Sequence, residues 1–321
     1  MKIVGIRPVL LQATYEAGSE LRWAGGRIES WDAALVEIHT ESGVTRLGEV
    51  AQGIVAAQAV PGIVAALRGY LDGVDFADPR RVGDYRASVV AAVPALDENI
   101  AYISSGTWSL VGVELDAPVL TTESREANFT NEIGIDGRIM FLRNVGGFWL
   151  MQECLRWWAD HGKPADLQVF LAAASARPSG GPAVDVDSMD FVAPDRMPLR
   201  IQEACRSTGQ RVPETPERIV RCVLDSLAAA YARTLEMAVR LSGKRVEAVH
   251  VVGGDSKNAL LCQLTADACG LPVVAGPAEA TAIGNMLVQA RAAGDVPSDH
   301  NGIRTIVARS FPVTTYQPRI T

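Results

Sequence analysis

The sequence lacks several features that would place it in a specialised class of proteins. Its 321 residues include only five cysteines and no close Cys-x-x-Cys pair, so we expect neither a zinc site nor the disulfide framework of a secreted domain. No stretch reaches the roughly 18 consecutive apolar residues of a membrane-spanning helix. The N-terminus has no apolar core or cleavage site typical of a signal peptide, and we therefore expect a cytoplasmic protein.

Positive charge is scarce relative to negative charge. Lys and Arg total 30 against 37 Asp and Glu, which gives a net charge of -7. Nucleic acids and anionic membrane surfaces attract clustered Lys and Arg, so we expect neither as a partner. Neither a Walker A loop nor a complete Gly-x-Gly-x-x-Gly motif occurs, and any nucleotide site must therefore have another design.

The chain is long enough for two domains, and its composition indicates where they meet. Around residues 72–81 the sequence turns polar and contains Gly and Pro, which predicts a boundary between a domain at 1–80 and a second at 81–321. In the first domain we expect a strand over 1–13, a loop over 16–28, a hairpin over 32–50 and a helix over 57–71.

The second domain shows strands and helices in alternation. Short apolar runs predict strands, and 3.6-residue periodicity predicts helices, at these positions: strands 101–104, 246–252 and 271–274, and helices 148–161, 217–241, 256–269 and 279–293. The Ala-, Pro- and Gly-rich stretch 164–200 is interpreted as an irregular connection. This order favours a parallel or mixed sheet covered by helices, in which ligands bind where strands end.

Two turns are candidate parts of such a site. Gly253 and Gly254 follow the predicted strand 246–252 directly, and Ser105-Gly106-Thr107 forms the tip of a predicted hairpin. Backbone N-H groups and a hydroxyl at a glycine turn suit a phosphate group.

Two amide side chains lie near the predicted helix 148–161. Asn144 precedes this helix and Gln152 lies about one turn inside it, so both amides could face one cleft. The alternative is that Asn144 caps the helix and Gln152 is solvated.

The cysteines are interpreted mostly as small buried hydrophobic residues. Cys205 and Cys222 meet if the segments that carry them pack side by side. Their spacing leaves open whether they pair, because a disulfide requires a specific geometry.

Residues 1–75, with their strand, Gly-rich loop, hairpin and helix, resemble the N-terminal capping domain of the enolase superfamily. In that family the cap closes over a barrel that supplies metal-binding carboxylates and a catalytic lysine. No barrel pattern follows here, and the four lysines of the chain include no Lys-x-Lys pair. We interpret the segment as a small α+β packing module, and an acid-sugar dehydratase or racemase is the weakest functional alternative.

Several blocks of the second domain occur in an order that resembles the C-terminal half of the FGGY carbohydrate kinases, in particular their rhamnulokinase branch. These blocks are 87–96, 101–112, 128–132, 143–153, 205–213, 250–258, 276–285 and 310–318. The resemblance implies an α/β fold of the actin and hexokinase (ribonuclease H-like) type, in which two domains close on ATP and sugar.

The resemblance also implies roles for the candidate residues. Thr107 would contact ATP phosphates, Gln152 would help hold the nucleotide, and Gly253 and Gly254 would let the backbone approach the adenosine of ATP or ADP. Asn144 would bind a ketose such as L-rhamnulose. Mg²⁺ would accompany ATP.

The sequence departs from the family pattern at two places. The family's His-Asp-Thr-Ala-Ser stretch contains the aspartate that acts as general base, whereas this chain has Asp84-Tyr85-Arg86-Ala87-Ser88. Tyr85 takes the place of the aspartate, and tyrosine, with a pKa near ~10, is a poor base at neutral pH. We therefore predict Asp84 as the base and place Tyr85 and Arg86 beside the substrate.

The second departure is an absence. The Asp-x-Gly-Thr phosphate loop of the kinase family occurs nowhere in the 321 residues. The leading hypothesis is an ATP-dependent sugar kinase that needs this loop from elsewhere, and the alternative is a non-catalytic nucleotide-binding or assembly module. An exposed half-cleft leaves apolar surface, which predicts self-association into a homo-oligomer.

Overall fold

The structure is a computed structural model of the chain. It describes residues 3–14, 21–23, 26–28, 30–41, 43, 45–50, 61, 64, 90–163, 166–178, 180–297 and 301–319. The chain divides into two compact units, unit 1 (Met1–Val82) and unit 2 (Gly83–Thr321).

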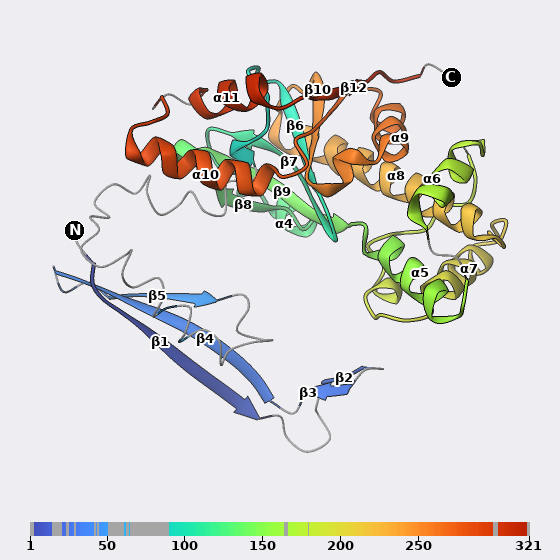
Figure 1. Ribbon diagram of the computed structural model, residues 1–321, viewed down its shortest axis with the longest axis horizontal. Coiled ribbons are helices and arrows are strands. Elements are labelled where there is room, and N and C mark those ends of the chain that lie inside the picture. Colours follow the sequence, from blue (N-terminus) through green and yellow to red (C-terminus); the bar gives the residue numbers. More distant parts are fainter. Residues whose placement is uncertain are drawn as a thin grey trace. The chain divides into compact units, whose positions relative to one another are not determined.

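Unit 1 contains a three-stranded antiparallel sheet in the order β1-β4-β5 (Figure 1). Its strands are β1 (Ile3–Thr14), β4 (Ser30–Thr40) and β5 (Thr45–Val50). The hairpin of β4 and β5 was expected from period-2 alternation, which places side chains on opposite faces of a strand. The predicted helix over 57–71 lies outside the described residues, apart from 61 and 64.

The predicted loop over 16–28 is wrong in its second half. β2 (Leu21–Trp23) and β3 (Gly26–Ile28) form a small antiparallel pair in which Leu21 is opposite Ile28 and Trp23 is opposite Gly26. The glycine content favoured a loop, but three-residue strands are too short to show an alternation pattern, and their backbone groups pair with each other nonetheless.

Unit 2 contains one large sheet and eight described α-helices. The strands are β6 (Ile100–Ser105), β7 (Trp108–Leu115), β8 (Thr130–Ile133), β9 (Ile139–Gly146), β10 (Ala248–Val252), β11 (Val273–Ala275) and β12 (Thr314–Tyr316). The helices are α4 (Thr122–Glu126), α5 (Trp149–Asp160), α6 (Leu167–Ser175), α7 (Met197–Ser207), α8 (Pro216–Ser242), α9 (Ala259–Cys269), α10 (Ala280–Ala293) and α11 (Gly302–Ser310), with 3-10 turns η3 (Ile135–Gly137), η4 (Met189–Phe191) and η5 (Gly254–Lys257).

The seven strands form a mixed sheet in the order β12-β11-β10-β6-β7-β9-β8. β6, β10 and β11 are parallel neighbours, and the other pairs are antiparallel. This confirms the predicted mixed sheet covered by helices. Within the described residues no helix is both long enough and apolar enough to cross a membrane.

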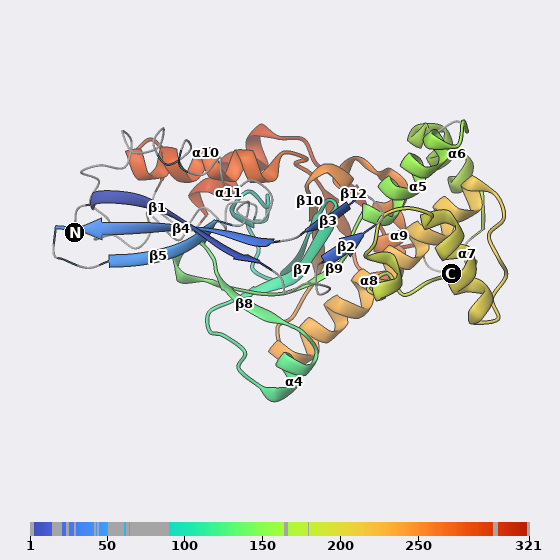
Figure 2. The same ribbon diagram turned by 90° about the horizontal axis from the view of Figure 1, so that it is seen from below.

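Helices cover both faces of this sheet (Figure 2). Ala101 and Ile103 of β6 belong to the hydrophobic core that includes α8 and α9, whereas Ile100 and Tyr102 belong to the core that includes α10 and α11. This alternation follows from the two-residue period of a strand. The apolar run of β6 is therefore buried on both faces, as expected for a central strand.

The interpretation of residues 164–200 as an irregular connection is wrong, because α6, η4 and the start of α7 lie there. Asp166 caps α6 by accepting hydrogen bonds from the backbone N-H groups of Gln168 and Val169. The alanines of α6 are good helix formers, and partly buried Phe170 and Leu171 pack on the core. The Pro and Gly content of the flanking loops hid this short helix.

A set of four buried polar side chains, here called the Arg304 cluster, lies on the sheet face covered by α10 and α11. Its members are Tyr102, Glu114, His250 and Arg304, none more than 7% exposed. Arg304 of α11 forms an ion pair with Glu114 of β7 and donates to the carbonyl of Val90. Within the described residues, the Tyr102 hydroxyl and His250 Nδ1 have no hydrogen-bond partner.

Candidate nucleotide site at the sheet edge

Both predicted ligand turns lie at the same edge of the sheet. β6 and β10 are parallel neighbours in which Ser104 is opposite Val252, so their carboxyl ends coincide. The turn Ser105-Gly106-Thr107 begins at the last residue of β6, and Gly253-Gly254 follows β10. Ligands of open α/β sheets bind outside the carboxyl ends of such strands.

The two positions after β10 are occupied by glycine for different structural reasons. Gly253 has φ +91°, and a Cβ atom there would lie 2.5 Å from the carbonyl oxygen of Ser105. Gly254 is exposed, and a Cβ atom there would meet nothing within 4 Å. Gly253 is therefore required by backbone packing, whereas Gly254 leaves open space beside the turn.

The Ser-Gly-Thr turn is held by the start of α5. Phe148 N donates to Gly106 O at 2.8 Å, and Trp149 N donates to Thr107 O at 3.1 Å. A Cβ atom on Gly147 would lie 2.5 Å from Thr107 O, so only glycine permits this close approach. Thr107 itself is exposed at the tip of the turn.

A buried hydrogen-bond network, here called the Tyr231 network, joins the two turns to α8. Its members are Ser105, Ser109, Tyr231 and Asp255. Ser105 Oγ donates to Asp255 Oδ2 at 2.8 Å, and the Tyr231 hydroxyl lies 3.2 Å from Ser105 Oγ and 2.7 Å from Ser109 Oγ. The network fixes η5 against β6 and so sets the relative position of the two turns.

Burial governs the charge state of this network. It raises the pKa of Asp255 to about 6, although the hydrogen bond from Ser105 acts in the opposite direction. Burial also raises the pKa of Tyr231 to about 12, which keeps the phenol neutral. Asp255 is therefore a carboxyl group that changes its charge near neutral pH, directly beside Gly254.

Asp255 and Tyr231 were not predicted as site residues. Asp255 had a local signal, since it follows the Gly-Gly turn at a strand end, but its contact with Ser105 spans 150 positions of sequence. Tyr231 had no local sequence signal, because it lies among the buried apolar residues of α8 and reaches the sheet edge only through tertiary packing.

Asn144 and Gln152 lie on different elements and are both exposed. Asn144 belongs to β9, and the residue that precedes the first turn of α5 is Phe148, so the alternative that Asn144 caps this helix is wrong. A pocket of about 300 Å³ includes Asn144 in its lining but not Gln152. This pocket therefore does not bring the two amides together.

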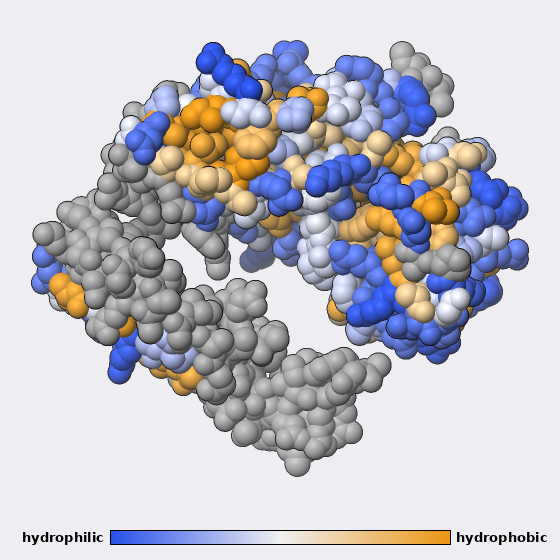
Figure 3. Space-filling view, viewed as in Figure 1, coloured by the Kyte–Doolittle hydropathy of each residue, from blue (hydrophilic) through white to orange (hydrophobic). Residues whose placement is uncertain are grey.

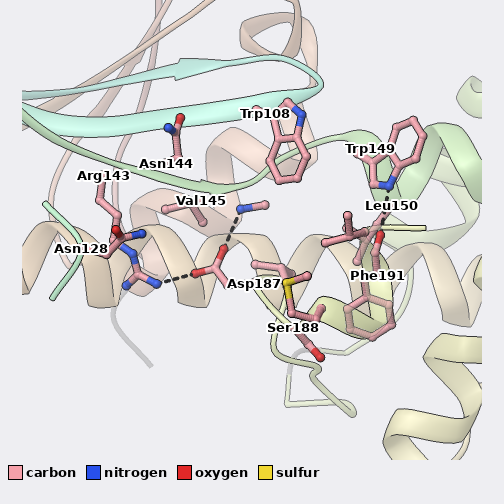
Figure 4. A pocket seen from close by; sticks show the side chains of 14 residues that line it. Trp108, Asn128, Arg143, Asn144, Val145, Trp149, Leu150, Asp187, Ser188 and Phe191 are labelled. Carbon is pink, nitrogen blue, oxygen red and sulfur yellow. Dashed lines mark hydrogen bonds and ion pairs between the residues drawn. The ribbon is translucent and has the colours of Figure 1, made fainter. Parts of the chain in front are cut away.

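That pocket, here called the Trp108 pocket, is bordered by the loop that contains η4 (Figure 4). Asp187 accepts a hydrogen bond from Gly146 N at 2.7 Å and pairs with Arg143 at 2.9 Å. Figure 4 shows Arg143 directed toward Asp187 and Asn144 on the other side of β9. Asp187 was not predicted as a site residue, because its segment was interpreted as irregular.

The remaining predicted site residues have no described geometry. Asp84, Tyr85 and Arg86 lie outside the described residues. Among the described side chains, no three of His, Cys, Asp or Glu gather into a metal-binding group.

Cys205 and Cys222 lie side by side, which the sequence left open. Their Sγ atoms are 4.0 Å apart, and both are free thiols. The hydrogen bond with Cys205 and burial both raise the pKa of Cys222. Four of the five cysteines are buried, which confirms their interpretation as small buried residues.

Unit 2 is thus an α/β domain whose candidate ligand-binding turns lie at one sheet edge, and comparison with known proteins identifies its family. Residues 101–293 match the model of the C-terminal domain of the FGGY family of carbohydrate kinases. The chain belongs to this family.

Curated relatives extend the match beyond those residues. The rhamnulokinase of Bacteroides thetaiotaomicron is 48% identical over 237 residues, which are 74% of this chain and 48% of the relative. The rhamnulokinase of Enterococcus faecalis is 41% identical over 233 residues, or 72% of this chain and 46% of the relative. The chain therefore spans about half the length of the curated relatives it matches.

Solved structures share the fold at low sequence identity. The xylulose kinase of Rhodospirillum rubrum matches with a TM-score of 0.54 and 14% identity over 73% of this chain and 46% of that chain. The gluconate kinase of Lactobacillus acidophilus matches with a TM-score of 0.51 and 16% identity over 72% of this chain and 45% of that chain. Unit 2 therefore has the actin/hexokinase-like fold of sugar kinases.

Proposed function

We propose that this chain is the nucleotide-binding part of an ATP-dependent sugar kinase of the rhamnulokinase type. The observation that carries this proposal is the geometry of the sheet edge, where exposed Thr107 and the open space at Gly254 follow two adjacent parallel strands. The identity of 48% to a rhamnulokinase supports the choice of branch within the family.

The surroundings of Gly254 and Thr107 support their roles, and the roles of Gln152 and Asn144 follow from the family resemblance. Gly254 lets an adenosine approach the backbone, since no side chain occupies that space. Thr107 offers a hydroxyl to the phosphates from a turn that α5 holds in place. Gln152 on the exposed side of α5 contributes to nucleotide binding, and Asn144 on β9 binds the ketose.

The proposed reaction transfers the γ-phosphoryl group of ATP to a hydroxyl of a ketose such as L-rhamnulose. The hydroxyl oxygen forms a bond to the γ-phosphorus, the bond from that phosphorus to the ADP oxygen breaks, and the hydroxyl proton passes to a carboxylate. We assign the carboxylate to Asp84, with Tyr85 and Arg86 beside the sugar.

Mg²⁺ would neutralise charge on the ATP phosphates. The ion would be held by the phosphates of ATP together with one or two carboxylates, as is common for Mg²⁺. Asp255 is the described carboxylate that lies beside both turns, and it holds Ser105 in position. A kinase that uses cellular ATP is expected in the cytoplasm.

Efficient turnover also requires a phosphate loop on the opposite side of the nucleotide, so the chain alone is expected to turn over slowly. Since the 321 residues contain no Asp-x-Gly-Thr sequence, this loop would come from another polypeptide segment. The same absence and Tyr85 favour a second candidate function, a nucleotide-binding module that does not turn over ATP.

Hydrophobic surface gathers over α10 and α11 (Figure 3). Met286 of α10 is 64% exposed. We propose that a second copy of the chain covers this surface, since exposed apolar patches often mark association sites. Light scattering should detect a dimer, and a monodisperse monomer at high concentration would contradict self-association.

A coupled assay of ADP production with ATP, Mg²⁺ and L-rhamnulose tests the kinase proposal. We expect turnover above background in the wild-type chain, a loss of roughly tenfold to a hundredfold in Thr107→Ala because a hydrogen bond to a charged group is lost, and activity near wild type in Thr107→Ser. If turnover stays at background while ADP still binds, the non-catalytic module is supported and the kinase is refuted. If the chain neither turns over ATP nor binds ADP, both proposed functions are refuted.

A further inference from the structure

A second pocket, also of about 300 Å³, shares no lining residue with the Trp108 pocket or the sheet-edge turns. It lies between the loop that follows α6 and the first turns of α8, in the helical part of unit 2 that Figure 1 shows around α6 and α7. Four arginines line it: Arg177, Arg211, Arg218 and Arg221. We call it the arginine pocket.

The walls of the arginine pocket are fixed by hydrogen bonds. The Gln210 side chain accepts from Ala183 N at 2.9 Å and donates to Ala183 O at 2.8 Å. Ser226 Oγ accepts from Val184 N at 2.9 Å. The two loops that form the pocket are thereby tied together and to α8, so the pocket is already formed without a ligand.

Two of the four arginines are satisfied within the protein. Arg221, only 7% exposed, donates from Nε to both carboxylate oxygens of Asp225 and from Nη1 to the carbonyls of Ala174 and Arg177. Arg177 pairs with Glu217 at 3.0 Å. These contacts hold the base of the pocket and the end of α6 in place.

The guanidinium charges of the other two arginines are not neutralised by a described partner. Within the described part of the chain, the guanidinium groups of Arg211 and Arg218 form no hydrogen bond or ion pair, although both residues line the pocket. Asp225 is the one carboxylate among the described lining residues, and burial raises its pKa. The pocket therefore carries an excess of guanidinium groups in a protein with a net charge of -7.

The other described lining residues are apolar and contribute no further charge. Its side chains come mainly from Pro178, Pro182, Val212 and Pro213. A ligand with a compact organic body can contact these walls while its charged group meets the arginines. Guanidinium groups prefer planar or tetrahedral oxyanions, which accept several parallel hydrogen bonds.

We propose that the arginine pocket binds a small phosphate monoester, whose phosphate is held by Arg211 and Arg218. A phosphate monoester carries a charge of about -1.5 to -2 at pH 7, which matches the two unpaired guanidinium groups better than a single carboxylate does. The proposal does not rest on the kinase activity, because none of these residues belongs to the sheet-edge site.

Calorimetry with fructose 1-phosphate as the probe tests this site in the full chain. We expect the wild type to bind fructose 1-phosphate. The affinity of the Arg211→Ala/Arg218→Ala double variant should be at least tenfold lower, and that of Arg211→Ala alone should be reduced by a smaller factor. Arg233→Ala is the matched control, since it removes the same charge from an exposed position of α8 outside the pocket. It should bind as the wild type does, and an equal loss there would overturn the proposal.

Two further titrations separate the ligand class and the location. Neutral fructose should give no heat, and inorganic phosphate should bind more weakly than the monoester; equal affinity for inorganic phosphate would overturn the assignment of an organic ligand. Gly254→Leu should retain the affinity for the monoester. Binding that disappears in Gly254→Leu and persists in the double arginine variant would place the anion at the sheet edge and refute the pocket. Absence of heat with the wild type would also refute it.

Discussion

The Tyr231 network and the Arg304 cluster lie on opposite faces of the same strands and differ in how completely their polar atoms are hydrogen-bonded. In the Tyr231 network each side chain has a partner between 2.7 and 3.3 Å away. The Arg304 cluster contains a buried ion pair beside two atoms, Tyr102 Oη and His250 Nδ1, without a partner in the described structure.

The polar groups of the Tyr231 network support the site, whereas the unpartnered polar atoms of the Arg304 cluster lower the stability of the fold. Buried polar groups without hydrogen bonds are unfavourable, whereas satisfied networks make the local structure rigid. The Tyr231 network holds the two turns of the proposed nucleotide site, and the Arg304 cluster joins α11 to the sheet away from it. Mutations in the two regions should therefore have different consequences.

The largest expected effect concerns the ion pair of the Arg304 cluster. Arg304→Met leaves the carboxylate of Glu114 buried without its partner, and the free energy of unfolding should fall by about 3 to 5 kcal/mol. Urea denaturation at pH 7 measures this. Arg240→Met is the matched control, because Arg240 and Glu123 are each 59% exposed and such surface pairs contribute under about 1 kcal/mol. A similar, small effect of both substitutions would show that the Arg304 pair has no special role.

A smaller effect is expected at the first glycine of the sheet-edge turn. Gly253→Ala introduces a side chain at φ +91° and against Ser105 O, and should lower the free energy of unfolding by about 2 to 3 kcal/mol. Gly254→Ala has free space and ordinary φ, so it should change stability by less than about 1 kcal/mol. Thermal denaturation compares the two. Equal stabilities would contradict the distinction between a packing glycine and a ligand-facing glycine.

The two regions should also respond to pH in opposite directions. Burial lowers the pKa of His250 to about 4, so its contribution to stability is present above pH 6.5 and is lost as the pH falls toward 4, because the unfolded chain binds the proton first. Burial raises the pKa of Asp255 to about 6, so its contribution is present below pH 3.8 and is lost as the pH rises through 6.

Substitutions that cannot titrate should separate these contributions. Relative to the wild type, Asp255→Asn should gain about 1 to 2 kcal/mol between pH 4 and pH 7, whereas His250→Gln should gain a similar amount between pH 6.5 and pH 4. Urea titrations at several pH values measure both differences. Differences that do not change with pH, or that change in the same direction, would refute the assigned charge states.

The sequence predicted those features whose signals are local. Helix 217–241 has an early Thr215-Pro216 start and a glycine after its end, and the structure places it at Pro216–Ser242 with Gly243 in the left-handed conformation. The turn at Gly253 was predicted because a buried strand ends there. The family resemblance of the second domain is confirmed. The resemblance of residues 1–75 to the enolase cap stays a prediction.

Features that depend on tertiary contacts could not be predicted. Ser105 and Asp255 are 150 positions apart, and Glu114 and Arg304 are 190 positions apart, so no spacing pattern relates them. The composition of residues 164–200 hid α6, since Pro and Gly surround a helix of only nine residues. The Asp84 base and its neighbours lie outside the described residues and stay predictions.

The central claim is that the edge formed by Thr107 and Gly254 binds an adenosine nucleotide, and one calorimetric titration tests it most directly. ADP is titrated into the wild-type chain and into Gly254→Leu, after thermal denaturation has shown that the variant is folded. We expect binding by the wild type and an affinity at least about tenfold lower in the variant, because leucine fills the space beside the turn. Equal affinity in both proteins, or no heat with either, would contradict the claim.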